Sequence, residues 1–352
     1  MINLKQRIKA FEKLGCFIRQ FTLHQPFFSY NEVDKNTFHE FAKLIENVYI
    51  YNGWFTKENV LSAIDAIAKF LEKDKMEKWI SGYDINKSGK NIGVIMAGNI
   101  PMAGFHDFLC VLISGNNITA KLSSNDKHLL PFIANVLIEI EPSFKEYIVF
   151  TDGQLKNIDA VIATGSNNSS RYFDYYFGKY PHIIRKNRHS IAVLTGKETM
   201  NELKKLGKDI FQYFGLGCRN VSKLMVPEGY NFTVFFEAIF DYNSVTVNNK
   251  YANNYDYNKT VYLLNGEKLL DNGFLLLKED IGLSSPVAVL YYEFYGDELS
   301  LKERIKMDLL SLQCIISGDK NNKGAIDFGN SQCPELSDYS DGVDTMKFLI
   351  DL

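Results

Sequence analysis

The stretch IGVIMAGNIP, residues 92–101, joins an apolar run to a polar turn that contains glycine, asparagine and proline. Later runs have the same apolar character, and helix patterns begin between them near Ala103, His128 and Asn167. Strands that alternate with helices form parallel sheets covered on both faces. The sequence therefore predicts an α/β fold, with strands expected at IGVIMA (92–97), NITAKL (117–122), YIVFT (147–151), DAVIAT (159–164) and SIAVLT (190–195).

The segments on either side of this region have other patterns. Residues 1–85 show helical spacing, with Val60, Ile64 and Ile67 following Thr56, a candidate N-cap. Further along, ETMNELKKLGKDIFQYF (198–214) predicts a helix, SKLMVP (222–227) a strand, and the asparagine-rich patch at 244–258 a surface loop. Because 352 residues are many for one core, we expect two domains.

Composition and charge exclude several classes of partner. Hydrophobic residues make up 46% of the chain and the net charge is −3, so no basic field points to nucleic acid or an anionic membrane. The five cysteines have no metal-like spacing, and their odd number argues against a disulfide framework. No apolar run approaches the length of a membrane span, and the N-terminus lacks a signal-peptide core. These patterns predict a soluble, cytoplasmic protein without a metal site.

Polar residues gather where three of the expected strands end. These segments are Gly98–Pro101, Lys121–Ser124 and Thr164–Ser166. Each alone has an ordinary explanation, since a lysine can extend along apolar surface and Gly and Ser mark turns. Neither GxGxxG nor a P-loop is present. The carboxyl ends of parallel strands are nevertheless where α/β folds bind nucleotides, so the three segments together indicate such a site.

The stretch GLGCRN (215–220) places Cys218 on a glycine-flanked turn before a strand. The glycines allow positive φ and leave space beside the sulfur, while Arg219 and Lys223 are cations that would raise the thiolate fraction of a nearby thiol. Free cysteine is also among the most buried residue types. From this stretch alone, Cys218 is either a nucleophile or a structural thiol.

In chain order, GNIP, AKLSS, ATGS, GLGCRN, LLLKEDIGLSSPVAVL and DFGNSQCPELSDYSDGVD resemble the aldehyde dehydrogenase superfamily. Within it the chain is most similar to the acyl-CoA reductase branch, the LuxC-type fatty-acid reductases. The resemblance runs from about residue 90 to the C-terminus. It implies a helical N-terminal segment and Rossmann-type nucleotide-binding domain over 1–197, a smaller α/β catalytic domain over 198–320, and a segment over 321–352 that returns to the domain interface.

The resemblance also implies roles for single residues. Cys218 stands at the position of the nucleophile, and Asn99 at that of the amide in the oxyanion hole. Lys121, with Ser123 and Ser124, stands where the adenosine ribose is bound, and Thr164, Gly165 and Ser166 where the cofactor pyrophosphate passes. Asp280, or alternatively Glu279, stands near the acid that holds the nicotinamide ribose. Phe328 and Gly329 match residues that line the acyl entrance.

Three departures from the family pattern refine the expectation. Hydrolytic relatives carry a water-activating glutamate where this chain has Arg185, and no acid occurs between Asp174 and Glu198, so His189 is the nearest candidate acid–base group. Ser124 replaces a glutamate typical of NAD-preferring relatives, which favours NADP(H). The stretch GYDINKSGKNIGV (82–94) has little room for the hairpin that pairs subunits in tetrameric relatives, so monomer and dimer both stay open.

The expected function is NADPH-dependent reduction of a long-chain fatty acyl-CoA, or another acyl thioester, to the aldehyde through an acyl-cysteine. An acyl-activating or acyl-transferring enzyme is an expected partner, because LuxC-type reductases work with such enzymes. Two alternatives remain: a cysteine acyltransferase or thioesterase that uses no nicotinamide, and a non-catalytic subunit of a fatty-acid-processing complex.

Overall fold

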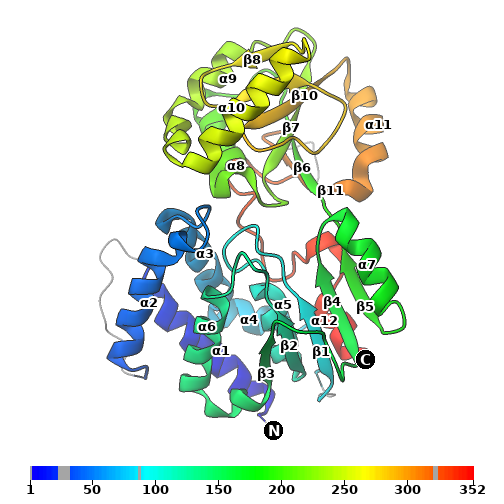
Figure 1. Cartoon of the computed structure of the whole chain (residues 1–352). Coiled ribbons are helices and arrows are strands. Elements are labelled where there is room, and N and C mark those ends of the chain that lie inside the picture. The colour runs from blue at the N-terminus through cyan, green and yellow to red at the C-terminus, as the bar shows by residue number, and fades with distance from the viewer. Residues whose placement is uncertain (1, 23–31, 86–88, 320–323) are drawn as a thin grey trace. The chain divides into compact units, whose positions relative to one another are not determined.

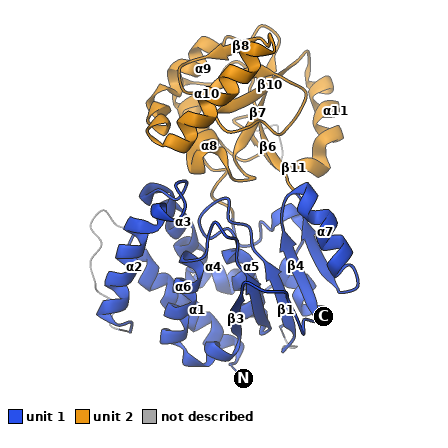
Figure 2. Cartoon of the chain, viewed as in Figure 1, with its two compact units in different colours: residues 1–186, 335–352 blue, residues 187–334 orange. Residues whose placement is uncertain are grey.

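The computed structural model describes residues 2–22, 32–85, 89–319 and 324–352. The chain forms two compact units: unit 1 comprises residues 1–186 and 335–352, and unit 2 comprises residues 187–334 (Figure 2). The first boundary between the units therefore falls between residues 186 and 187, whereas the sequence predicts it after residue 197. The expected boundary at 320/321 lies outside the described residues.

Unit 1 is built on a five-stranded parallel sheet with the order β3-β2-β1-β4-β5 (Figure 1). Its strands are β1 (Asn91–Ile95), β2 (Asn117–Lys121), β3 (Ile148–Thr151), β4 (Ala160–Thr164) and β5 (His182–Arg185). Four of them match the prediction. The fifth is HIIR, which pairs with β4, whereas the expected strand SIAVLT lies in the sheet of unit 2. From β1 the chain moves outward through β2 to β3, and it then crosses to the other side of β1 to form β4 and β5. Because crossovers between parallel strands are right-handed, this reversal places helices on both faces of the sheet.

The predicted helical N-terminal segment is confirmed. It contains α1 (Leu4–Arg19), α2 (Lys35–Asn47), the 3₁₀ turn η1 (Val48–Ile50), α3 (Lys57–Phe70) and α4 (Lys73–Ile80), and Thr56 caps α3 by accepting a hydrogen bond from the Asn59 backbone N–H. Phe11 of α1 packs edge-on against Phe108 and Phe144. The segment therefore shares one core with α5 (Phe105–Ser114), α6 (Leu129–Ile140) and η2 (Pro142–Glu146), whereas α7 (Asn167–Phe177) packs against β4 and β5.

The C-terminal residues return to unit 1. They form η6 (Ser340–Gly342) and α12 (Thr345–Ile350), and α12 packs on α5. The Trp79 indole donates to the Tyr339 hydroxyl at 2.7 Å, and the Tyr83 hydroxyl donates to Asp344 at 2.9 Å. Asp344 accepts a hydrogen bond from the Lys347 backbone N–H and so starts α12.

Unit 2 contains a six-stranded sheet with the order β11-β6-β7-β10-β9-β8, in which β8 alone is antiparallel. The strands are β6 (His189–Val193), β7 (Val221–Pro227), β8 (Leu269–Asp271), β9 (Leu276–Glu279), β10 (Val289–Tyr295) and β11 (Leu312–Ser317). The helices are α8 (Met200–Phe211), η3 (Gln212–Gly215), α9 (Phe232–Ala238), η4 (Phe240–Val247), α10 (Asn249–Leu264), α11 (Glu298–Asp308) and η5 (Leu309–Ser311). The predicted helix before Cys218 and the predicted strand after it are both confirmed.

The asparagine-rich patch at 244–258 is mainly helical, so its assignment as a loop was wrong. Asn248 accepts hydrogen bonds from the backbone N–H groups of Lys250 and Tyr251 and so caps α10. Tyr251, Tyr255 and Asn258 recur at helical spacing and are buried. The sequence did not reveal this buried helix face, because asparagine favours turns unless tertiary packing decides otherwise.

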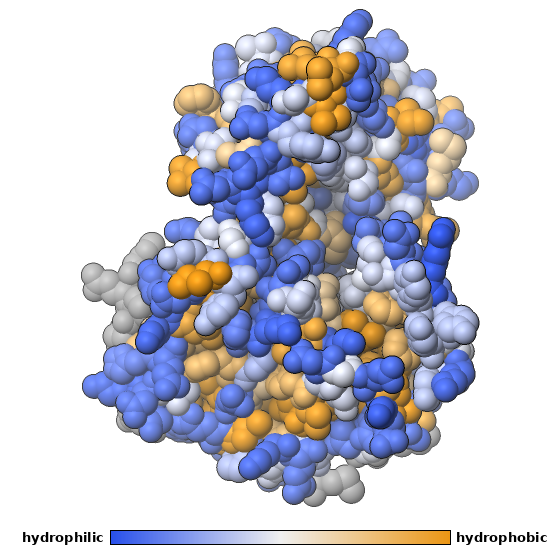
Figure 3. All heavy atoms as spheres, in the orientation of Figure 1, coloured by the Kyte–Doolittle hydropathy of each residue, from blue (hydrophilic) through white to orange (hydrophobic). Residues whose placement is uncertain are grey.

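The surfaces of both units mix hydrophilic and hydrophobic residues on the face that Figure 3 shows. Within the described ranges, no helix has the length and apolar character needed to cross a membrane.

Candidate active site

Cys218 lies on a turn whose backbone is held at several points. Tyr213, Phe214 and Gly215 have φ values of 53°, 58° and 77°, so the chain winds sharply before the cysteine. The Ser190 hydroxyl donates to the Cys218 carbonyl oxygen at 2.9 Å, and the Gly217 N–H donates to Asn220 Oδ1 at 2.8 Å. The Cys218 residue itself is exposed. An exposed thiol on a fixed backbone suits a nucleophile better than a core position.

Asn220 is the main support of this turn. Its side-chain amide donates to the carbonyl oxygens of Asp209 and Gln212, at 3.0 and 2.8 Å, while its Oδ1 accepts from Gly217. Asn220 is 2% exposed. In the sequence Asn220 is the last residue of GLGCRN, and its position directly after the turn is the available signal of this role.

The two cations near Cys218 in sequence have partners of their own. Arg219 Nη1 lies 3.3 Å from Cys314 Sγ, and the fully buried Lys223 is paired with Glu293. Lys223 is therefore engaged in an ion pair rather than available as a free charge for the thiol.

His189 is the first residue of β6, next to Ser190, which holds the cysteine turn. It is partly buried, and burial lowers the pKa of its imidazole, which favours the neutral form. A neutral imidazole can accept or donate a proton, so the structure leaves His189 a candidate acid–base group.

Phe328 and Gly329 belong to unit 2 and are anchored to α8. The Gly329 and Ser331 N–H groups donate to the two carboxylate oxygens of Asp209, at 2.6 and 2.9 Å. Burial raises the pKa of Asp209, and these hydrogen bonds partly offset that. Phe328 is 5% exposed and its ring packs closely against Gly318. The helix that leads to Cys218 thus also fixes the phenylalanine–glycine segment.

Glu279 ends β9 and Asp280 follows it, and both line a cavity of about 570 Å³ with Gly266, Glu267, Lys268, Ile281 and Glu293. Asp280 accepts hydrogen bonds from Lys278 Nζ at 2.7 Å and from the Gly282 N–H at 2.8 Å. Burial works against the charged form of Asp280, but these donors outweigh it and hold its pKa below the ordinary value. The acid is therefore ionised and able to accept hydroxyl hydrogen bonds.

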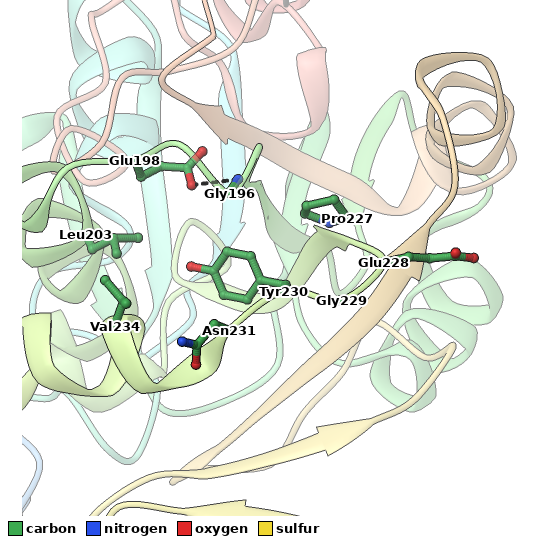
Figure 4. A pocket seen from close by; sticks show the side chains of 9 residues that line it. All are labelled: Gly196, Glu198, Leu203, Pro227, Glu228, Gly229, Tyr230, Asn231 and Val234. Carbon is green, nitrogen blue, oxygen red and sulfur yellow. Dashed lines mark hydrogen bonds between the residues drawn. The ribbon is translucent and has the colours of Figure 1, made fainter.

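A second cavity, of about 310 Å³, lies at the other end of β7 from the cysteine turn (Figure 4). Tyr230, Glu198 and Pro227 are among its lining residues, and Glu198 accepts a hydrogen bond from the Gly196 N–H at 3.0 Å. Cys218 precedes β7, whereas this cavity follows it, so the cavity is not the binding pocket of the thiol.

In unit 1 the structure brings the three predicted polar segments to one edge of the sheet. Ile95 of β1 pairs with both Lys121 of β2 and Ala163 of β4. The three strands therefore end side by side, and the segments that follow them begin at the same edge of the sheet. A Cβ on Gly98 would lie 2.5 Å from Ser123, which shows how closely the first two loops pack. Asn99 and Ser124 are exposed there.

Gly165 and Ser166 form the entry to α7. A Cβ on Gly165 would lie 2.8 Å from the Phe173 ring, so only glycine lets the turn approach the helix this closely. Ser166 caps the helix through the Ser169 N–H at 3.1 Å. The positive end of the α7 dipole suits a pyrophosphate. Together with Lys121 and the serine hydroxyls, this edge fits a dinucleotide.

Asp126 supports the same edge, although no pattern in the sequence indicates this role. Its carboxylate accepts a hydrogen bond from the Met102 N–H at 2.7 Å, and Met102 has a φ of 55°. Asp126 is 6% exposed, and burial raises its pKa to about 6. It ties the loop that carries Asn99 to the loop that carries Ser123.

Comparison with known families shows that the acyl-CoA reductase (LuxC) family model matches residues 30–233. The chain belongs to the LuxC acyl-CoA reductase family. Its members are oxidoreductases that reduce acyl groups to aldehydes, and the expected resemblance is confirmed. No curated protein matches the chain.

Solved structures similar to this LuxC-family chain include several aldehyde dehydrogenases. The aldehyde dehydrogenase 21 of Physcomitrella patens, in complex with succinate, has a TM-score of 0.63 at 12% identity and covers 99% of this chain and 89% of its own. The NAD⁺ complex of an aldehyde dehydrogenase from Bacillus cereus has a TM-score of 0.63 at 12% identity, covering 92% and 73%. The lactaldehyde dehydrogenase of Escherichia coli has a TM-score of 0.61 at 14% identity, covering 91% and 75%. The predicted fold class, aldehyde dehydrogenase-like α/β, is confirmed.

Proposed function

We propose that this LuxC-family chain reduces a long-chain fatty acyl-CoA, or another acyl thioester, to the aldehyde with NADPH, through an acyl intermediate on Cys218. The observation that carries the proposal is the exposed Cys218 on a turn fixed by Ser190 and Asn220. Such a turn keeps the thiol in one place while the substrate carbonyl approaches.

In the first step the Cys218 thiolate attacks the thioester carbonyl carbon. A new S–C bond forms, the bond to the carrier sulfur breaks, and the carrier leaves as a thiolate. The Cys218 N–H and the Asn99 side-chain amide are the proposed donors to the oxyanion, and a donor of this kind lowers the barrier by about 3–4 kcal/mol. His189 is the proposed group that takes the proton of the Cys218 thiol and then donates it to the departing carrier thiolate, or to the oxygen of the tetrahedral intermediate.

Bound NADPH supplies the hydride that reduces the acyl group. Lys121, Ser123 and Ser124 are proposed to hold its adenosine ribose and 2′-phosphate, and Thr164, Gly165 and Ser166 its pyrophosphate. Asp280 or Glu279 is proposed to accept hydrogen bonds from the nicotinamide ribose, and Phe328 and Gly329 to line the acyl entrance. The polar loops at the carboxyl edge of unit 1 and the ionised Asp280 support this assignment.

The acyl thioester would come from an acyl-activating or acyl-transferring enzyme, because the reaction consumes an activated acyl group. Incubation of the chain with radiolabelled acyl-CoA of different lengths, with and without NADPH, tests the proposal. We expect label on the protein without NADPH and labelled aldehyde after its addition. Transfer of the acyl group to another thiol, or rapid release of fatty acid, without any use of NADPH would favour an acyltransferase or thioesterase. No labelling at all would favour a non-catalytic subunit.

A further inference from the structure

Lys223 is an ionisable residue that the proposed chemistry does not use, and it is fully buried. It lies on β7 and has 0% relative exposure. Its Nζ donates to the Glu293 carboxylate, on the neighbouring strand β10, and to the Ile281 carbonyl oxygen at 2.9 Å. Burial lowers the pKa of Lys223, and Glu293 partly offsets this. A buried lysine is costly unless its partners are well placed.

Arg304 of α11 binds the same two acceptors. Its Nε donates to the Glu293 carboxylate oxygens at 2.9 and 3.2 Å, and its Nη2 donates to the Ile281 carbonyl oxygen at 2.7 Å. Arg304 Nη1 also binds Asp308, at 2.5 Å. Two cations from different elements thus converge on one carbonyl oxygen, and hydrogen bonds from charged donors are stronger than neutral ones.

The carbonyl that they hold belongs to the turn at 280–283. Inside this turn the Gly282 N–H donates to Asp280 Oδ1 at 2.8 Å, and the Ser222 hydroxyl, next to Lys223, donates to the Leu283 carbonyl oxygen at 2.7 Å. The Ile281 side chain is 78% exposed. Because Ile281 adds no buried apolar anchor, polar contacts fix the turn at this residue.

The strand that holds this turn also begins just after Cys218. Ser222 Oγ lies 3.3 Å from the Ser190 carbonyl oxygen, and the Ser190 hydroxyl holds the Cys218 carbonyl. The strands β6 and β7 therefore fix both the cysteine turn and the 280–283 turn within unit 2.

We propose that Lys223 and Arg304 are positioning residues that hold the 280–283 turn so that the Asp280 carboxylate faces its cavity and can bind the nicotinamide ribose hydroxyls. This inference rests on the proposed function. Neither residue touches the acyl group. Their loss should weaken dinucleotide binding and leave the acylation of Cys218 in place.

The test compares Lys223→Met with the wild-type chain and with Lys302→Met. Methionine fills similar apolar space without a charge, and Glu293 keeps Arg304 as its partner. Lys302 lies on α11 like Arg304 but forms an exposed pair with Glu298, so its substitution is a matched control. Arg304→Lys is the conservative variant: it keeps a cation but loses the separate guanidinium donors to Glu293 and to the Ile281 carbonyl oxygen.

Three measurements separate positioning from a general loss of structure. In Lys223→Met we expect the NADPH dissociation constant to rise about tenfold, as loss of a charged hydrogen bond implies. The rate of Cys218 labelling by radiolabelled acyl-CoA without NADPH should stay within about twofold, because Ser190 and Asn220 are untouched. Amide hydrogen exchange at 281–283 should become faster in the absence of any ligand. Arg304→Lys should show a smaller rise in the dissociation constant, and Lys302→Met none.

Two outcomes would overturn the inference. One is unchanged NADPH affinity in a folded Lys223→Met chain. The other is an equal loss of labelling, NADPH affinity and thermal stability, which would mean a purely structural role. A wild-type chain that neither takes up label nor binds NADPH would instead refute the proposed function. The exchange measurement would still show whether Lys223 fixes the turn, so the two failures are distinguishable.

Discussion

The Arg185 guanidinium binds both carboxylate oxygens of Asp107, at 2.5 and 2.8 Å, and the Thr345 hydroxyl at 2.9 Å. Both charged side chains are largely buried. Burial lowers the pKa of Arg185, but Asp107 outweighs this, and the net pKa is raised. The resemblance noted in the sequence places Arg185 near the position at which hydrolytic relatives are expected to carry a glutamate. In this chain the side chain at that position joins β5, α5 and α12 instead.

We expect Arg185→Met to lower the free energy of unfolding by about 3–5 kcal/mol, because it leaves the Asp107 carboxylate buried without its cation. The double variant Arg185→Met/Asp107→Leu should regain most of this loss. Denaturant unfolding measures both. Lys69→Met, which breaks an exposed pair with Asp65, is the control and should cost less than about 1 kcal/mol. A double variant no more stable than the single one would contradict the assignment.

Cys218→Ala should abolish covalent labelling by radiolabelled acyl-CoA. Of the other cysteines, Cys16 and Cys333 are exposed and Cys110 and Cys314 are buried. Cys16→Ser and Cys333→Ser are therefore the matched controls, and both should label at the wild-type rate. Peptide mapping of the labelled chain identifies the acylated residue. Label on another cysteine, or label that survives in Cys218→Ala, would refute the role of Cys218.

The acyl-enzyme should hydrolyse slowly without NADPH and form aldehyde when NADPH is added. The guanidinium of Arg185 stays protonated and is bound to Asp107, so it cannot activate water. Glu198, the next acid along the chain, accepts hydrogen bonds from Thr195 and Gly196 beyond the end of β6. Quenched-flow measurement of free fatty acid and aldehyde checks this. Fatty acid released as fast as aldehyde would refute it.

Sequence patterns predicted the parts of the fold that depend on short-range order. Apolar runs ending in polar turns marked β1, β2, β3 and β4, because parallel strands buried on both faces are near-continuous apolar runs. The patterns could not tell which sheet a strand joins. SIAVLT looks like the earlier strands but pairs with β7, and HIIR is too short and too polar at its ends to stand out.

Most residues of the candidate site were predicted because they lie in turns or at the ends of strands. Cys218, Asn99 and Gly165 follow from glycine and asparagine at strand ends. Asp209 gave no such signal, because it lies within a helix and meets Gly329 and Ser331 only through a contact about 120 residues away in sequence. Lys223 likewise lies in a strand pattern, where a lysine is ordinarily read as solvent-facing. Long-range polar contacts of this kind are set by tertiary packing.

Stability should fall as the pH rises through the range in which Asp126 ionises. Burial raises its pKa from 3.8 to about 6, so between about pH 4 and pH 6 the folded chain holds a proton that the unfolded chain has lost. This difference corresponds to at most about 3 kcal/mol. Asp126→Asn should be more stable than wild type at pH 7.5 and equal to it near pH 4, by urea unfolding at each pH. Asp152→Asn, which changes an exposed carboxylate, should keep the wild-type dependence of the free energy of unfolding on pH. If the free energy of unfolding of Asp126→Asn depended on pH as it does in wild type, the prediction would be contradicted.

Cofactor preference should depend on Ser124, the exposed residue three positions after Lys121 at the edge of unit 1. A 2′-phosphate brings up to two negative charges there, and one charge pair about 4 Å apart is worth about 4 kcal/mol at an effective dielectric of about 20. Desolvation and screening reduce this to about 1–2 kcal/mol, or about a tenfold preference for NADPH. Lys127 is paired with Asp152 at 3.2 Å, but the pair is exposed and weak, so a phosphate can compete for the lysine.

Ser124→Glu should reverse this preference, because the new carboxylate would accept the ribose hydroxyls and repel the 2′-phosphate. The values of kcat/KM for NADPH and NADH, measured in wild type and in Ser124→Glu, check the prediction. Ser124→Gln is the matched control: it has the same length without the charge, and so should weaken the preference without reversing it. Asp152→Asn should strengthen the NADPH preference, since it releases Lys127. If wild type prefers NADH, or if the ratio is the same in all four chains, Ser124 does not face the adenosine ribose.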